Sequence, residues 1–239
     1  GDYTGVIKEN LFDYFKSKLP APSVETLTDM MIEYQKDMFE AGITSVQSDE
    51  YNYVPEGFFF TLQELLCIAA EERRLKLRLS SQALYFKPEA LEYAFEKGYD
   101  HTFGNDTLHI SATKLLADGS LGARTAYMRQ PYADDPSTRG LLMFSQEELD
   151  KMVAISHRNN TPAIIHAIGD GAIQMCLDAI ERAQKAMPYL KPRHGIVHCQ
   201  VTDKAMIRRF KELDVVAYIQ PVFIDYDMNI IYDRVGRDL

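Results

Sequence analysis

Three ionisable side chains lie at or near the ends of apolar runs, where they could share one metal ion. They are Lys114, His166 and His198. Imidazole nitrogens are common ligands of Zn²⁺, which also accepts a water molecule in catalytic sites. A lysine ammonium has three donors and no acceptor, so Lys114 can join two imidazoles only as an anionic carbamate. These residue types predict a divalent metal centre.

Three more polar residues follow the same runs and are candidates for supporting roles. Asp118 comes just after the Lys114 run and is a candidate for substrate binding. Arg124 could hold an anionic group of a substrate or pair with a surface carboxylate. Asp170 could hold a metal ligand in position by a hydrogen bond, although a helix N-cap is the simpler interpretation.

The other histidines favour structural roles. Alternate residues of a strand face opposite sides. His109 lies near the start of its predicted strand and on the opposite face from Lys114. His194 shares a face with His198 but lies near the start of its strand, away from the C-terminal end. His157 falls on a predicted helix and His101 in a loop. We expect these four to lie outside the metal centre.

The elements that must position the candidate ligands alternate along the chain. Helix-period segments follow short apolar runs, which is typical of βα units around a parallel sheet. The predicted strands are GITSVQ, LKLRLSSQ, LHISATKLL, TPAIIHAI, RHGIVHC and VVAYIQP, and the predicted helices are 23–41, 61–74, 87–97, 145–160, 170–187 and 202–213. In a parallel α/β barrel, catalytic groups lie at the C-terminal strand ends, as the three candidates do here.

The strand count predicts an incomplete barrel. Six strands are present where a closed (β/α)8 TIM-like barrel needs eight. Residues 1–41 are predicted to be loop and helix, and 223–239 a loop entering a helix. We therefore expect 1–239 to be the central part of one α/β barrel domain that lacks the first and last strands. The turn-rich stretch 117–145 is too long for an ordinary connection and is predicted to cover the active-site face.

Composition excludes several other classes of protein. The 26 basic and 35 acidic residues give a net charge of −9 without a dense basic stretch, so we expect no nucleic-acid partner. The apolar runs are far shorter than the roughly 20 residues of a membrane helix. The start lacks the pattern of a secretory signal, and three widely spaced cysteines fit buried thiols in a reducing compartment. We expect a cytoplasmic protein. The sequence does not decide whether it forms a homo-oligomer.

Several longer motifs resemble one known family. They are KLLADGSLGARTAYMRQPYADD, HAIGDGA, HGIVHCQ and VVAYIQP. Together they resemble the amidohydrolase superfamily, specifically its amidohydrolase family 3 branch, which includes N-substituted formamide deformylases. The resemblance extends from TGVIKE near the start to the end of the chain. Its most specific parts are Lys114–Ala126 and His166–Asp170.

This resemblance implies a distorted (β/α)8 barrel with one or two metal ions, usually zinc, that hydrolyses C–N bonds of amide-like, non-peptide small molecules. Lys114 would be the carboxylated bridging lysine, with His166 the strand-five ligand and His198 the strand-six ligand. The family pattern also needs a His-x-His pair on the first barrel strand and an Asp at the end of the eighth. This chain contains no His-x-His, and it lacks the eighth strand that would carry the Asp. We therefore expect the 239-residue chain alone to bind metal weakly and to be inactive.

Two departures from the family pattern keep alternatives open. Gly171 stands where the family usually has Arg, and Val197 replaces a common Glu. These changes would permit a non-catalytic relative with a binding or regulatory role. A third hypothesis is a Schiff-base barrel enzyme, in which a desolvated Lys114 is the nucleophile.

Overall fold

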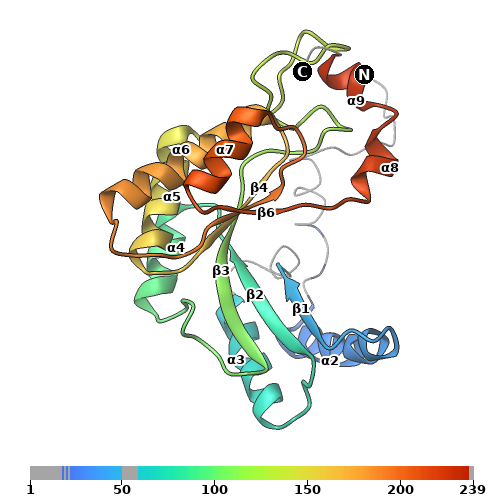
Figure 1. Ribbon diagram of the computed structural model, residues 1–239. Helices are drawn as coiled ribbons and strands as arrows, with labels where there is room; N and C mark the ends of the chain where they lie inside the picture. The colour runs from blue at the N-terminus through green and yellow to red at the C-terminus, as the bar shows by residue number, and fades with distance from the viewer. Residues whose placement is uncertain (1–17, 19, 21, 50–58, 237–239) are drawn as a thin grey trace. The chain divides into compact units, whose positions relative to one another are not determined.

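The computed structural model describes residues 18, 20, 22–49 and 59–236 (Figure 1). The chain divides into two compact units, Gly1–Thr44 with Tyr53–Leu77, and Ser45–Asn52 with Arg78–Leu239. The segment TGVIKE and most of the stretch expected to form an N-terminal loop lie outside the described residues.

The first unit contains two packed helices, α2 (Val24–Glu40) and α3 (Phe59–Glu71). The buried side chain of Gln35 fixes the chain that follows α3. Its Nε2 donates to the carbonyl of Arg74 at 2.7 Å, and its Oε1 accepts the N–H of Lys76 at 2.8 Å. Because both polar ends of Gln35 are paired, the residue can be buried at little cost.

The second unit is built on a six-stranded parallel sheet. The strands are β1 (Ser45–Ser48), β2 (Arg78–Leu84), β3 (Leu108–Leu116), β4 (Ala163–Ala167), β5 (Gly195–His198) and β6 (Val216–Tyr218). They pair in simple chain order, β1 to β6, and every pair is parallel. A doubly wound sheet would reverse its strand order at a switch point. The uninterrupted order instead matches part of a (β/α)8 barrel.

The helices of this unit complete the βα pattern. They are α4 (Pro88–Glu96), α5 (Gln146–Arg158), α6 (Asp170–Ala186), α7 (Lys204–Glu212), α8 (Phe223–Asp227) and α9 (Ile231–Val235). Helices α4 to α7 lie next to one another (Figure 1), and α5 and α6 pack against β4. In the described part of the chain, no helix combines the length and the apolar composition that a bilayer span requires.

The predicted strands and helices are confirmed, with shifted ends. The largest loss of length is at β6, which covers only VAY of the predicted VVAYIQP. Ile219, the next residue, is already 64% exposed, so the apolar run continues after the strand has ended. The C-terminal segment predicted to enter a helix forms the two short helices α8 and α9.

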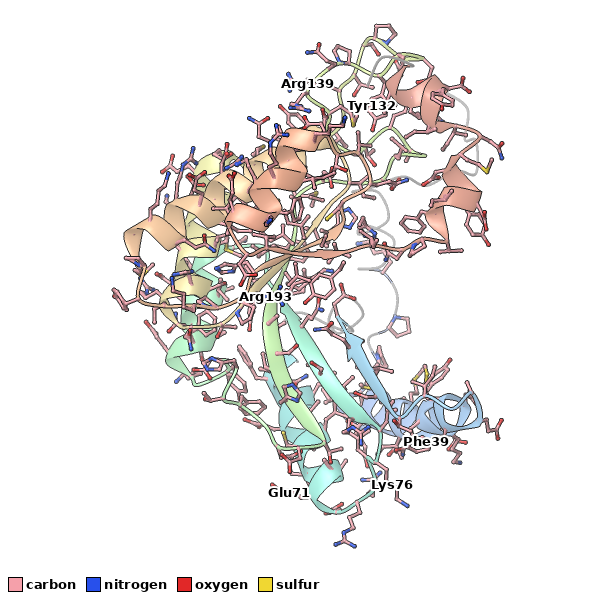
Figure 2. The ribbon with its side chains drawn as sticks, in the orientation of Figure 1. Phe39, Glu71, Lys76, Tyr132, Arg139 and Arg193 are labelled. Carbon is pink, nitrogen blue, oxygen red and sulfur yellow. The ribbon has the colours of Figure 1, made fainter. Side chains whose placement is uncertain are left out.

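The stretch 117–145 contains no helix or named strand, as expected of a loop, yet four of its residues pack with Ile168 and Val201 in a buried core. Tyr132 is almost fully buried, and its hydroxyl donates to the carbonyl of Ala126 at 2.7 Å. Figure 2 labels Tyr132 and Arg139 in this loop. Ile231 and Val235 of α9 pack against the same core. The long loop is therefore held by packing as well as by its ends.

Candidate metal centre

The three predicted ligands lie on three neighbouring strands. Lys114 is late in β3, His166 is the fourth residue of β4, and His198 is the last residue of β5. The register pairs Leu116 with His166, and Ala167 with His198. Both imidazoles thus reach the C-terminal edge of the sheet, where barrel active sites lie.

The two imidazoles contact each other edge to face. The ring centroids of His166 and His198 are 4.5 Å apart, with an angle of 77° between the ring planes. His198 and Cys199 have φ values of +76° and +50°, which side-chain-bearing residues rarely adopt. Strained backbone of this kind concentrates at functional sites. The Cys199 N–H donates to the Ala167 carbonyl at 3.2 Å, which holds the turned backbone in place.

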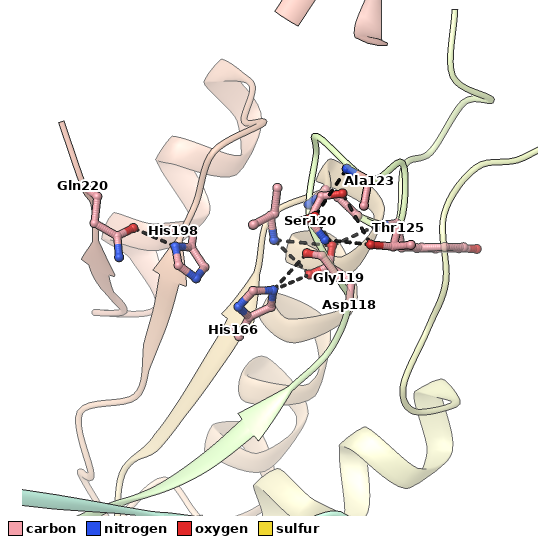
Figure 3. A network of polar contacts seen from close by, with 12 residues as sticks. Asp118, Gly119, Ser120, Ala123, Thr125, His166, His198 and Gln220 are labelled. Carbon is pink, nitrogen blue, oxygen red and sulfur yellow. Dashed lines mark hydrogen bonds and ion pairs between the residues drawn. The ribbon is translucent and has the colours of Figure 1, made fainter. Parts of the chain in front are cut away.

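Hydrogen bonds decide which nitrogen of each ring is free. Nε2 of His166 lies 3.0 Å from the carbonyl oxygen of Gly119 (Figure 3). A carbonyl only accepts, so Nε2 carries the proton and Nδ1 keeps its lone pair. Nδ1 of His198 lies 2.6 Å from Oε1 of Gln220, which leaves Nε2 of His198 as the acceptor nitrogen. Metal-binding histidines are typically held in this way by their second nitrogen.

Burial favours the neutral form of both rings. It lowers the pKa of His166 to about 4; the positive charge of Lys114 lowers this pKa further, and the hydrogen bond to Gly119 opposes the shift. Burial also lowers the pKa of His198. Because only the neutral imidazole can bind a metal, both side chains are prepared for ligation at neutral pH.

Lys114 is buried beside one carboxylate. Its Nζ lies 3.5 Å from Oδ2 of Asp49, the residue after β1. Burial lowers the pKa of Lys114, and the charge of Asp49 opposes that shift. A neutral amine is the form that reacts with CO₂ or with a carbonyl group, so the lowered pKa suits either chemistry.

The buried carboxylate of Asp118 accepts hydrogen bonds from backbone N–H groups. Its side chain accepts the N–H groups of Ile168 at 3.0 Å, Gly169 at 2.8 Å and Tyr127 at 2.9 Å. Oδ1 also lies 3.4 Å from Nε2 of His166. Burial raises the pKa of Asp118 to about 6, although the three N–H groups favour the carboxylate. Asp118 therefore ties the long loop to the turn after β4 and contacts His166.

Glycines allow the long loop to lie directly on the start of α6. A Cβ on Gly169 would come within 2.1 Å of the Tyr127 carbonyl oxygen, and one on Gly171 within 2.8 Å of the Tyr127 ring. The same carbonyl accepts the N–H groups of Gly171 and Ala172, both at 3.1 Å. A side chain at position 171, such as the expected Arg, would therefore require Tyr127 to move. Nothing in the structure explains Val197.

Arg129 joins the long loop to the starts of two helices. Its backbone N–H and its Nε donate to Asp170 at 2.8 and 2.7 Å, and its terminal nitrogen donates to Asp203 at 2.6 Å. Asp170 begins α6, and Asp203 is the N-cap of α7. The N-cap interpretation of Asp170 is wrong, because Gly169 occupies the cap and the carboxylate of Asp170 binds Arg129 instead.

Arg124 already has a carboxylate partner. Its Nε and terminal nitrogen donate to the two oxygens of Asp134 at 3.0 and 2.8 Å. Arg234 of α9 binds the same carboxylate. The guanidinium of Arg124 would have to leave Asp134 to bind an anionic group of a substrate, so its substrate role stays a prediction.

Two other histidines form a buried pair at the opposite end of β4. The N–H of Ala163 donates to Nδ1 of His194 at 2.9 Å, so the proton of His194 is on Nε2. That nitrogen lies 2.9 Å from Nδ1 of His157, whose Nε2 lies 3.1 Å from the carbonyl of Met187. Every ring nitrogen is thus satisfied within the fold.

The last two histidines also lie away from the candidate ligands. His109 is exposed near the start of β3. His101 lies in the loop before β3, and its Nδ1 is 3.1 Å from the hydroxyl of Thr161.

The described residues fit part of a metal site. They contain no group of three or more His, Cys, Asp or Glu placed to hold one ion. What they offer is one free nitrogen each on His166 and His198, with Lys114 on the adjacent strand. A catalytic zinc site uses about three protein ligands and an open position. A carbamate on Lys114 would supply the third.

A family model described as the amidohydrolase family matches residues 1–238. The chain belongs to the amidohydrolase family. The branch that contains N-substituted formamide deformylases stays a prediction.

Named relatives agree with this amidohydrolase assignment. YtcJ of Bacillus subtilis (strain 168) is 28% identical over 241 residues, covering 100% of this chain and 43% of YtcJ. Solved structures of metal-dependent hydrolases from Pyrococcus furiosus and Pyrococcus horikoshii OT3 are 29% and 30% identical, both with a TM-score of 0.77. They match 95% and 99% of this chain, which covers 44% and 45% of theirs. The chain thus spans less than half the length of these relatives.

Two residues of this candidate site were missed from sequence. Asp49 directly follows β1, and Gln220 lies two residues beyond β6. Both obey the strand-end rule that identified His166 and His198, so the signal was present. Arg129 gave no such signal, because its partners are 41 and 74 residues away.

Proposed function

We propose that the protein to which this chain belongs is a metal-dependent hydrolase of C–N bonds in amide-like, non-peptide small molecules. Its metal ligands within this chain are Lys114, His166 and His198. One observation carries the proposal: the two imidazoles meet edge to face with their centroids 4.5 Å apart, and each has one ring nitrogen held by an oxygen. A structural pair would use both nitrogens within the fold, as His157 and His194 do.

A bound divalent metal, for which zinc is the best candidate, polarises a substrate carbonyl and lowers the pKa of water. His166 and His198 offer it neutral nitrogens. Nζ of Lys114 attacks the carbon of CO₂, forming one N–C bond and releasing one proton, and the resulting carbamate offers anionic oxygen. Asp118 and Gly119 hold His166 in position. The long loop 117–145 covers this face of the sheet, and Arg124 is its candidate for an anionic substrate group.

The rest of the site is expected from the remainder of the protein. Residues 1–239 form the central part of one barrel domain in this proposal, and the missing strands supply further ligands. We therefore expect the 239-residue chain alone to bind zinc weakly and to be inactive. The free cysteines Cys67, Cys176 and Cys199 favour a reducing cytoplasm.

The proposal is tested by zinc content and hydrolysis in the longer protein that carries this chain. His166→Ala and His198→Ala should each lower zinc occupancy and reduce hydrolysis of N-formyl and N-acyl compounds by about 100-fold or more. His109→Ala is the matched control, since His109 is an exposed histidine of the same sheet. Full zinc occupancy and activity in both site variants would refute the proposal.

A Schiff-base enzyme is the second candidate, favoured by the buried Lys114 amine with its lowered pKa. Reduction with borohydride in the presence of a carbonyl substrate would trap a substrate adduct on Lys114. In the hydrolase proposal no adduct forms, and activity depends on zinc. The non-catalytic alternative rests on Gly171 and Val197, and retained zinc-dependent hydrolysis in the longer protein would rule it out.

A further inference from the structure

An open recess of about 390 Å³ adjoins His198. Its walls come from the ends of β5 and β6 and from the α8 and α9 region. The apolar lining includes Ile219, Phe223, Ile224, Met228 and Ile231. Small-molecule pockets typically have volumes of roughly 300 to 1,000 Å³ and mostly apolar walls. The recess is therefore large enough for a substantial part of a ligand.

The candidate metal ligand forms one wall of this recess. The ring of Phe223 stacks on the ring of His198, with centroids 5.6 Å apart and planes 19° from parallel. Gln220, which holds Nδ1 of His198, also lines the recess. A molecule reacting beside His198 would thus extend naturally along Phe223 into the apolar space.

The far wall is anchored to the body of the unit. Ile231 both lines the recess and packs against the buried core of the long loop. Three exposed apolar residues complete the opening, namely Ile219, Ile224 and Met228. Apolar surface that remains open beside a candidate site marks a place where a ligand can gain affinity by excluding water.

The polar residues of the recess select against anions. Asp227 is its only acidic lining residue, and it accepts a hydrogen bond from Gln200, which also lines the recess. No lysine or arginine is among the lining residues, all of which lie in the described part of the chain. A carboxylate entering the recess would be repelled by Asp227, and no lining side chain supplies a compensating cation, whereas a neutral group would not be repelled.

We propose that this recess binds a neutral, apolar alkyl or aryl substituent of the substrate. The inference rests on the proposed hydrolase function and sharpens it: the preferred compounds are amides with a bulky apolar group next to the scissile bond. The amide lies beside His198, and the apolar group lies among Ile224, Met228 and Ile231.

Binding of primary amides to metal-free protein tests the recess separately from catalysis. Affinity is measured by NMR titration for acetamide, butanamide, hexanamide and octanamide, with both the 239-residue chain and the longer protein. Each buried CH₂ should tighten binding about fourfold, until the chain length fills the recess. The same series is then assayed for hydrolysis by the zinc-loaded longer protein.

Matched substitutions on α8 locate the binding. Ile224→Asp should weaken hexanamide binding about tenfold or more, because it puts a second carboxylate in the recess. Tyr226→Asp is the control, since Tyr226 is equally exposed on α8 but does not line the recess. Met228→Asp provides a second test if the first variant is unstable.

The outcomes separate the two proposals. Chain-length-dependent binding that Ile224→Asp weakens and Tyr226→Asp leaves unchanged supports the recess, even if no amide is hydrolysed and the hydrolase proposal fails. Hydrolysis with equal affinity for all four amides overturns the recess alone. Binding by the short chain that disappears in the longer protein also overturns it, because other parts of the barrel would then fill the space.

Discussion

A carbonyl and a carboxamide determine the chemistry open to the two candidate ligands. The Gly119 carbonyl fixes the proton of His166 on Nε2, and Gln220 does the same for Nδ1 of His198. The free nitrogens are therefore Nδ1 of one ring and Nε2 of the other. Asp118 supports this arrangement from a buried position in which its oxygens accept three backbone N–H groups.

Replacing Asp118 with Asn should separate this supporting role from substrate binding. The side chains have the same shape, but Asn offers one acceptor oxygen where Asp offers two, so at least one backbone N–H loses its partner. We expect the free energy of unfolding to fall by about 1 to 3 kcal/mol. Urea denaturation measures this, with exposed Asp106→Asn as the control. An unchanged free energy of unfolding in Asp118→Asn would instead leave substrate binding as its role.

Buried His194 makes the fold sensitive to acid. The folded state keeps His194 neutral down to a pKa of about 3, because burial lowers it from 6.5. The unfolded chain takes up this proton near pH 6.5, so acid favours unfolding as the pH falls from 6.5 toward 3. His166 acts in the same direction, while Asp118, with its pKa raised to about 6, opposes both.

His194→Gln removes one of these titrating groups. Between pH 6.5 and 4, the variant should lose stability less steeply than the unmodified chain, by about 1.4 kcal/mol per pH unit. Urea unfolding at several pH values gives both slopes. His109→Gln, at an exposed position, should keep the original slope. Identical slopes for all three proteins would show that His194 is not kept neutral by the fold.

At the scale of elements, Arg129 links three successive βα segments. It lies in the loop after β3 and binds the first residue of α6 and the N-cap of α7. These helices begin just after the strands that carry His166 and His198. One guanidinium thus helps to fix the spacing between the two candidate ligands.

Arg129→Ala should therefore affect both stability and metal binding. It leaves the buried carboxylate of Asp170 without its cation, and we expect a loss of about 2 kcal/mol in unfolding free energy. Zinc affinity should fall as well. Arg129→Lys should restore only part of the affinity, since one ammonium group cannot bind both carboxylates as the guanidinium does. Arg158→Ala, which removes an exposed pair with Glu92, is the control. Unchanged zinc affinity in Arg129→Ala would limit Arg129 to a structural role.

The elements were largely predictable because hydrophobic periodicity and strand length are local properties. LHISATKLL was predicted to the residue, and the Ser145 capping box begins α5 as its sequence indicates. The end of β6 was not predictable, because it depends on which neighbours pair with VVAYIQP. Likewise, the contacts of Arg129 depend on the folded path of the long loop, which no local pattern specifies.

At the scale of the whole molecule, the chain is one part of an amidohydrolase barrel. Six parallel strands in unbroken order agree with the family match over residues 1–238 and with solved hydrolase structures at a TM-score of 0.77. The strand count predicted from sequence agrees with the observed sheet. The chain covers 43% of YtcJ and 44% of the Pyrococcus furiosus hydrolase.

The central claim is that His166 and His198 bind the same metal ion through Nδ1 and Nε2, respectively. A crystal structure of the zinc-loaded longer protein, with anomalous scattering at the zinc edge, tests it most directly. We predict an anomalous peak about 2.0 to 2.1 Å from both nitrogens, with a carbamate oxygen of Lys114 as a further ligand. Zinc bound elsewhere, with these two nitrogens left unliganded, would contradict the claim.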